Sequence, residues 1–276
     1  MSQAPVGSLG LIAGQGELPL AAARSVAGRR IVAIGFEGLT DPGLAALAEV
    51  VWLDPGQVGQ ALGALRAAGV REAVMLGKVP KAGLLGDGSG VEPDVRARRL
   101  LAGLRDRSDD AILAAVADLL AEHGIALLEQ AAVLPSLVAA EGVLGSLLPT
   151  VEQRVDVAYG FNVAKAIAAL DVGQTVVVKQ GAVLAVEAIE GTDATIRRAG
   201  AITSGACIVK VAKPGQDPRF DVPTIGPDTL FAAREAGAGL LAFEAGHTLV
   251  IARERLVAEA DAHGIVVLGT AGGAVA

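Results

Sequence analysis

The chain has 276 residues, a formal net charge of -7 at pH 7, and a composition that is 52% hydrophobic but only 3% aromatic. This apolar fraction predicts a sizeable core of Ala, Leu, Val and Ile and argues against intrinsic disorder. The acidic balance argues against nucleic-acid binding, which needs clustered Lys and Arg, so we expect no nucleic-acid partner. The single cysteine, Cys207, excludes an intramolecular disulfide, and no uninterrupted apolar stretch predicts a membrane span.

The N-terminal segment alternates strand patterns with helical patterns. The predicted strands are SLGLIAG, RRIVAIGF, VVWLDPG and EAVMLGKV, and the helices between them include LPLAAARSVAG and QVGQALGALRAAGV. Strands that alternate with helices predict an α/β fold with a doubly wound, Rossmann-like parallel sheet. Ligands of such sheets bind at the carboxyl ends of the strands, so functional residues are expected there.

A change of pattern near Pro149 predicts a boundary between an N-terminal domain, residues 1–149, and a C-terminal domain, residues 150–276. The second domain begins with a long helix, VEQRVDVAYGFNVAKAIAALDVG. We expect hairpins at QTVVVKQGAVLAVEAIEGTD and at GLLAFEAGHTLVIA, further helices, and a last strand at IVVLG. This mixture predicts a mixed α/β fold for the C-terminal domain.

Two glycine turns follow predicted strands of the N-terminal domain. In GLIAGQGELP, Gly14 and Gly16 let the backbone turn tightly before a helix that starts near Pro19. The free backbone N–H groups at such a helix start bind anions. In GKVPKAG, Gly77 and Lys78 follow the fourth strand and should face the same crevice, where a lysine can hold phosphate. The alternatives are an ordinary strand–helix turn and a solvated surface lysine.

Asp109 and Asp110 stand at the start of a predicted helix. Capping and the helix dipole explain one carboxylate there. A second carboxylate exceeds what capping needs and leaves a metal or ribose contact open.

Covalent catalysis and a zinc site are not expected. The three histidines show no metal-ligand spacing, no GxSxG motif is present, and Cys207 has no base near it in sequence.

The stretch EGTD follows an apolar strand and concentrates charge at a bend. Glu190 and Asp193 flank Gly191, and carboxylates at such a bend suit a hard cation such as Mg²⁺. Arg197 and Arg198 follow one turn later and suit a phosphate or carboxylate. The alternative is a capped helix with a surface ion pair.

The loop KPGQDPRFDVPTIG also follows an apolar strand. It carries Lys213, Asp217, Arg219 and Asp221 among three prolines, which restrict the backbone and lower the entropy cost of a fixed geometry. Together with EGTD it supplies carboxylates for a metal and cations for phosphate, as metal-assisted phosphoryl hydrolysis requires. The alternative is a structural network of salt bridges.

These motifs resemble a known family. LDVGQ, AVEAIEGTDATIRRAG, KVAKPGQDPRFDVPTIGPDT and FEAG, with GLIAGQGELP, LGKV and SDDAIL before them, are similar to the UDP-2,3-diacylglucosamine pyrophosphatases of the LpxI type. The resemblance implies an N-terminal nucleotide (UDP)-binding domain and a C-terminal catalytic domain. It also implies a homodimer in the cytoplasm, peripherally associated with the inner leaflet of the inner membrane. The implied reaction of lipid A synthesis uses Mg²⁺, or another divalent cation such as Mn²⁺, to hydrolyse the lipid-linked substrate to UMP and 2,3-diacylglucosamine 1-phosphate (lipid X).

We assign site residues from the motifs and the resemblance together. Asp221 is the first choice for a metal ligand or for the group that orients the attacking water. The catalytic set is Asp221, Asp193, Glu190, Asp217, Lys213, Arg197 and Arg219, with Asp221, Asp193 and Glu190 as metal ligands. The substrate-binding set is Gly14, Gln15, Gly16, Leu18, Lys78, Asp110, Gln180 and Thr192.

Two other classes of protein remain as alternatives. One is a nucleotide- or lipid-binding protein without catalysis, which the full set of acidic residues disfavours. The other is a Rossmann-type oxidoreductase, disfavoured because Pro19 stands where the dinucleotide fingerprint has its third glycine.

Overall fold

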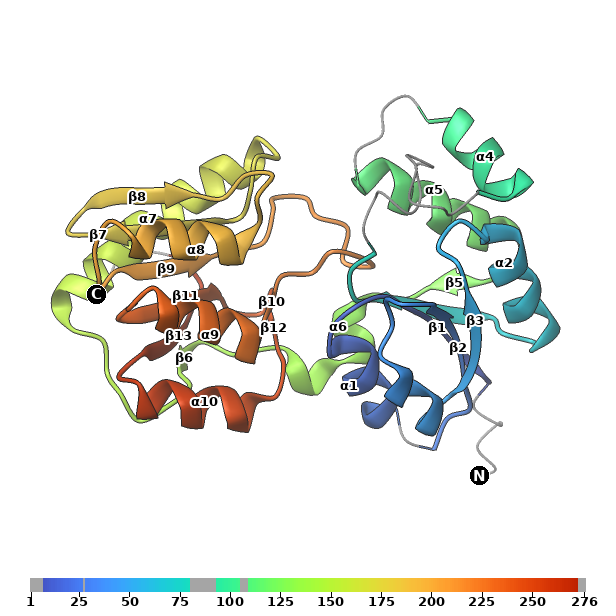
Figure 1. The fold of residues 1–276 in the computed structure, drawn as a ribbon, viewed down its shortest axis with the longest axis horizontal. Helices are drawn as coiled ribbons and strands as arrows, with labels where there is room; N and C mark the ends of the chain where they lie inside the picture. Colours follow the sequence, from blue (N-terminus) through green and yellow to red (C-terminus); the bar gives the residue numbers. More distant parts are fainter. Residues whose placement is uncertain (1–6, 27, 80–92, 105–108, 273–276) are drawn as a thin grey trace. The chain divides into compact units, whose positions relative to one another are not determined.

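The computed structural model describes residues 7–26, 28–79, 93–104 and 109–272 (Figure 1). The chain forms two compact units. Unit 1 comprises Met1–Leu134 with Pro218–Phe220, and unit 2 comprises Pro135–Asp217 with Asp221–Ala276. Each unit has its own sheet, and the chain passes between the units three times.

The change of unit after Leu134 comes earlier in the chain than the expected boundary at residue 149. The intervening segment belongs to unit 2 because it forms hydrogen bonds with residues there. Ala139 N donates to Thr248 O at 3.1 Å, and Val143 pairs with Leu268 in an antiparallel register.

The sheet of unit 1 is parallel throughout and has the strand order β3-β2-β1-β4-β5. Its strands are β1 (Leu9–Ala13), β2 (Ile31–Phe36), β3 (Glu49–Leu53), β4 (Glu72–Leu76) and β5 (Ala126–Leu127). All six residues of β2 are buried, as expected of a parallel strand that is covered on both faces. The predicted doubly wound α/β sheet is confirmed.

Helices cover both faces of this sheet (Figure 1). They are α1 (Leu18–Ser25), the 3-10 helix η1 (Pro42–Ala46), α2 (Val58–Ala67), α4 (Val95–Ala102), α5 (Asp109–Glu122) and α6 (Gln130–Val133). Leu62 and Leu65 of α2 and Leu120 of α5 pack with apolar residues of the strands in one cluster. Phe220 is also part of unit 1, where it is 4% exposed and packs with Met75 and Ala117.

The main sheet of unit 2 is mixed, which confirms the predicted mixed α/β fold. Its order is β6-β13-β11-β9-β7-β8, with β9, β11 and β13 parallel and the other pairs antiparallel. The strands are β6 (Gly142–Val143), β7 (Thr175–Lys179), β8 (Ala182–Val186), β9 (Cys207–Lys210), β11 (Leu240–Glu244) and β13 (Val266–Thr270). A small parallel sheet joins β10 (Thr224–Ile225) to β12 (Leu249–Val250).

The prediction of a hairpin at GLLAFEAGHTLVIA was wrong, whereas the predicted hairpin between β7 and β8 is present. All five residues of β11 are buried, and the strand lies between two parallel neighbours, β9 and β13. Both hydrogen-bonding edges of β11 are therefore occupied, and β12 pairs with β10 instead.

One long helix covers one face of this sheet and three helices cover the other. They are α7 (Val151–Ala169) on the first face, and α8 (Thr192–Gly200), α9 (Pro227–Glu235) and α10 (Arg253–Ala262) on the second; a short 3-10 helix, η2 (Pro135–Leu137), precedes β6. Gly160 allows α7 to approach the sheet closely, since a Cβ there would lie 2.8 Å from Val209 Cγ2. No helix in the described ranges is long and apolar enough to cross a membrane.

Candidate functional site

The two glycine turns of unit 1 lie against each other. They follow β1 and β4, which are neighbours in the sheet at the point where the strand order reverses, the place where such folds bind ligands. Gln15 N donates to Lys78 O at 2.8 Å, and Lys78 N donates to Gln15 O at 3.1 Å. A Cβ on Gly14 would lie 2.7 Å from Lys78 O, and one on Gly77 would lie 2.5 Å from Gln15 O. The close backbone contact therefore requires glycine at both positions.

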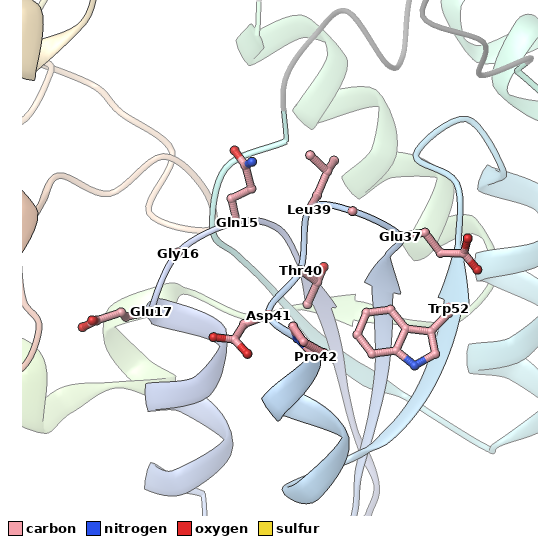
Figure 2. Close-up of a pocket in the computed structure, with 10 residues that line it drawn as sticks. Gln15, Gly16, Glu17, Glu37, Leu39, Thr40, Asp41, Pro42 and Trp52 are labelled. Carbon is pink, nitrogen blue, oxygen red and sulfur yellow. The ribbon is translucent and has the colours of Figure 1, made fainter.

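A pocket of about 830 Å³ opens beside the first turn, at the carboxyl ends of β1, β2 and β3 (Figure 2). Its size is within the range of small-molecule sites. The lining residues are Gln15, Gly16, Glu17, Glu37, Gly38, Leu39, Thr40, Asp41, Pro42 and Trp52. The Trp52 ring and the Glu37 carboxylate lie on the same side of this pocket (Figure 2).

Sequence reasoning missed Glu37 and Trp52. An available signal was that an acidic residue about 20 positions after the glycine turn, at the end of the second strand, contacts ribose in doubly wound folds. Glu37 directly follows β2 and fits that position. Trp52 gave no such signal, because its place at the pocket depends on the pairing of β3 with β2.

The wall of the pocket is braced by Thr40, whose side chain is buried. Phe36 N donates to Thr40 Oγ1 at 2.8 Å, and this hydroxyl donates to Ala13 O, directly before Gly14. Leu18, which was predicted to bind substrate, is buried in the first turn of α1 and does not line the pocket. Asp110 lies in the first turn of α5, and its side chain is outside the described part of the chain.

In unit 2, the EGTD stretch forms the N-terminus of α8. Glu190 accepts hydrogen bonds from Ala188 N at 3.1 Å and Arg198 Nη2 at 2.7 Å, and Thr195 Oγ1 also donates to it, at 3.3 Å. These hydrogen bonds, first those from the backbone and then that from Arg198, hold the pKa of Glu190 below its ordinary value. Asp193 lies in the first turn of the same helix.

The other predicted residues around α8 also have partners within unit 2. Thr192 Oγ1 donates to Glu187 Oε1 at 2.8 Å. Arg197 Nε donates to Glu235 at 2.9 Å, and this hydrogen bond raises the pKa of the arginine. Gln180 lies in the turn between β7 and β8 with a φ of 50°. The ion pairs of Arg197 and Arg198 match one part of the alternative for EGTD, a capped helix with a surface ion pair, but the N-cap residue Gly191 makes no side-chain capping hydrogen bond.

The segment of residues 213–226, here called the charged loop, brings Lys213 and Asp221 together. Lys213 Nζ lies 2.6 Å from Asp171 Oδ1 and 3.9 Å from Asp221 Oδ2. Gln216 bridges Lys213 and Asp221: its Oε1 accepts a hydrogen bond from Lys213 N at 3.2 Å, and its Nε2 donates one to Asp221 O. Asp221 has a φ of 56°, in the left-handed region that non-glycine residues seldom adopt. Strained backbone of this kind is concentrated at functional sites.

The remaining residues of the charged loop are divided between the units. Asp217 is the last residue of unit 2 before the crossing, and Arg219 belongs to unit 1, where its guanidinium lies 5.7 Å from the Phe220 ring centroid. The apolar anchoring of Phe220 explains why the loop leaves unit 2 at this point.

The three predicted metal ligands, Asp221, Asp193 and Glu190, do not form a group. Among the residues that the structure describes, no three acidic, histidine or cysteine side chains lie close enough together to hold a metal ion.

Asp171 was missed as a partner of Lys213. It has a φ of 54° just after α7 and is part of the stretch LDVGQ, which sequence analysis noted without giving it a role. Cys207 is buried, and desolvation raises the pKa of its thiol to about 12. The thiol is thus protonated at neutral pH, which makes it a poor nucleophile.

Comparison with known proteins gives a match over both units. The family model for the LpxI N-terminal domain matches residues 8–137, and that for the LpxI C-terminal domain matches residues 140–268. The chain is 36% identical over 277 aligned residues to the UDP-2,3-diacylglucosamine pyrophosphatase LpxI of Caulobacter vibrioides. This alignment covers 95% of the present chain and 96% of that relative.

Proposed function

Because the chain belongs to the LpxI family, we propose that it is a pyrophosphatase that hydrolyses UDP-2,3-diacylglucosamine in lipid A synthesis. The products are UMP and 2,3-diacylglucosamine 1-phosphate. The family relationship supports the substrate, and the geometry of the charged loop supports the reaction type.

The observation that carries this proposal is the pairing of Lys213 with Asp221 on a braced loop. An ammonium group beside a carboxylate offers one group for the phosphate oxygens and one for the attacking water. Gln216 holds both residues through their backbones, so their relative placement does not depend on the substrate. Preorganised charge of this kind lowers the barrier because little reorganisation is needed during the reaction.

We assign the chemical step to hydrolysis of the pyrophosphate with water as the nucleophile. The water oxygen forms a bond to the phosphorus nearer the sugar, and the bond from that phosphorus to the bridging oxygen breaks. UMP leaves with the bridging oxygen and the electron pair. Asp221 orients the water and takes its proton, while Lys213 neutralises charge on the phosphate oxygens.

The nucleotide side of the substrate is assigned to the pocket of unit 1. Backbone N–H groups at the start of α1 favour phosphate, and Lys78 adds a cation beside the same turn. The Glu37 carboxylate suits ribose hydroxyls, and the Trp52 ring offers a flat apolar surface to a base (Figure 2).

Dependence on Mg²⁺, or on another divalent cation such as Mn²⁺, is part of the proposal. Asp221 is the residue that would hold the cation together with pyrophosphate oxygens, and a bound cation would offset their negative charge. Chelation with EDTA should stop UMP release, and added Mg²⁺ should restore it. Full activity in EDTA would contradict metal dependence while leaving the hydrolase assignment intact.

We also propose peripheral association with the inner leaflet of the inner membrane, on the cytoplasmic side, and a homodimer. Exposed apolar side chains at the start of α7 support an interaction surface: Leu148, Val151, Val155 and Tyr159. The last three follow one another at intervals of four residues and so lie on one face of the helix. Flotation with anionic vesicles tests the membrane association, and light scattering of the purified protein tests the homodimer. Each experiment uses Val155→Glu as a comparison.

The decisive experiment incubates the protein with UDP-2,3-diacylglucosamine in water enriched in ¹⁸O and follows both products by ³¹P NMR. We expect UMP release and ¹⁸O in the lipid phosphate, which reports attack on the phosphorus nearer the sugar. Label in UMP instead would overturn the assigned point of attack. Binding without release of UMP would overturn the hydrolase and favour the non-catalytic binding protein.

A further inference from the structure

A mostly buried ion pair lies at the entrance to the charged loop. Lys165 Nζ, on α7, lies 2.9 Å from both carboxylate oxygens of Glu244, at the end of β11. The side chains are 31% and 10% exposed, respectively. The ammonium also lies 5.9 Å from the centroid of the Phe161 ring. Glu244 belongs to the FEAG stretch, one of the motifs that carry the family resemblance, and was not among the predicted site residues.

The ion pair holds both backbone polar groups of Ala212, the residue directly before Lys213. Ala212 N donates to Glu244 Oε2 at 2.7 Å, and Ala212 O accepts from Lys165 Nζ at 2.9 Å. Because both polar groups of this residue are fixed, the direction in which the chain enters the loop is fixed as well. The Lys213 side chain leaves the backbone one residue later.

The far end of the loop is held in a similar way. The ammonium of Lys210, which is 8% exposed, donates to Thr224 O at 3.0 Å. Gln216 then braces the interior of the loop between Lys213 and Asp221. Polar contacts thus hold the loop at its start, in its middle and near its end.

Stability alone is a weak reason to place an ion pair at this depth. Taking two charges out of water is expensive, and replacing a buried pair with apolar residues of similar size is often neutral or stabilising. A carboxylate and an ammonium can hold a particular N–H and a particular carbonyl, however, which apolar side chains cannot do.

We propose that Glu244 and Lys165 are positioning residues for Lys213: they fix the peptide that enters the charged loop and so place its ammonium beside Asp221. This role rests on the proposed hydrolysis at Lys213 and Asp221. Neither residue needs to contact the substrate, because the effect reaches the reaction through Ala212.

The test replaces both members of the pair with residues of similar length, in Lys165→Met/Glu244→Met. We expect kcat to fall about tenfold or more with KM changed less than about threefold, because displaced catalytic groups lose rate more than binding. Hydrogen exchange of the backbone amides of residues 212, 213 and 215–217 should become faster than in the wild type. Lys165→Arg, which can still donate to Ala212 O and Glu244, should recover most of the rate.

A stability-matched control separates positioning from general damage. Leu256→Ala opens a cavity in the core of unit 2, where Leu256 is fully buried, and leaves the ion pair intact. It should lower the melting temperature while keeping kcat within about twofold of wild type. Wild-type kcat in the double variant would overturn the positioning role. So would a loss of kcat that Leu256→Ala reproduces when the two variants are compared at the same folded fraction.

The exchange measurement keeps this proposal distinct from the proposed function. If the wild-type protein releases no UMP, the hydrolase assignment fails and the catalytic part of the inference fails with it. The exchange rates still show whether the pair holds the loop. Unchanged exchange in the double variant would overturn that structural part too.

Discussion

The side-chain amide of Gln216 donates a hydrogen bond to the backbone carbonyl of Asp221, further along the charged loop. The same amide accepts from Lys213 N at 3.2 Å, so one side chain joins the two residues that carry the proposed chemistry. Asp221 has a left-handed φ of 56°, and contacts of this kind are needed to hold a non-glycine residue there.

Gln216→Glu tests this brace. Glutamate keeps an acceptor for Lys213 N but loses the donor to Asp221 O and places a negative charge beside that carbonyl. We expect kcat to fall by about tenfold, since small displacements of catalytic groups are costly. Gln57→Glu, at the start of α2, adds the same charge while keeping its acceptor for Asp54 N and should leave the rate unchanged. Equal rates for the two variants would contradict the brace.

Asp221 can be tested without disturbing its backbone. Asn tolerates the left-handed conformation better than most residues and Gly adopts it freely, so Asp221→Asn and Asp221→Gly both remove the carboxylate with little added strain. We expect kcat to fall by about 10²–10⁴, the usual contribution of a general base, with substrate binding still measurable. Asp228→Asn, in the first turn of α9, serves as the control. Near-normal turnover in both Asp221 variants would reject the role.

The contact between the glycine turns predicts opposite outcomes for two alanine substitutions in unit 1. Gly77→Ala places a Cβ 2.5 Å from Gln15 O at a φ of 83°, so we expect a loss of about 1–3 kcal/mol in the free energy of unfolding. Gly63→Ala, in α2, meets nothing within 4 Å and should stabilise by roughly 0.5–1 kcal/mol. Urea unfolding measures both, and calorimetry with UDP should show weaker binding for Gly77→Ala alone.

The hydrogen bonds to Glu190 predict a pH-dependent contribution to stability. Its folded pKa is lowered from the ordinary value of 4.5, first by backbone hydrogen bonds and then by Arg198. The stabilisation is therefore present above the unfolded pKa and is lost as pH falls through the folded pKa. We expect Glu190→Gln to have a lower urea midpoint than wild type at neutral pH, with the difference shrinking in acid. A difference that stays constant with pH would contradict this assignment.

Much of the fold was predictable because it depends on local patterns. Buried apolar runs such as those of β2 and β9 predicted the strands, and glycine turns predicted where the strands end. The hairpin expected after β11 failed because two neighbouring apolar runs do not reveal which strand each run pairs with. That pairing depends on β9 and β13, which come from other parts of unit 2.

The sequence by itself determined the α/β class, the two glycine turns of unit 1 and the charged loop as a concentration of catalytic residue types. Only the tertiary structure decided which charged side chains contact one another. It placed Asp171 on Lys213, engaged Glu190 with Arg198, and set Lys165 and Glu244, 79 positions apart, around Ala212. Strands and turns are encoded by neighbouring residues, whereas ion pairs between distant elements follow from how strands and helices pack and leave no periodic pattern in the chain.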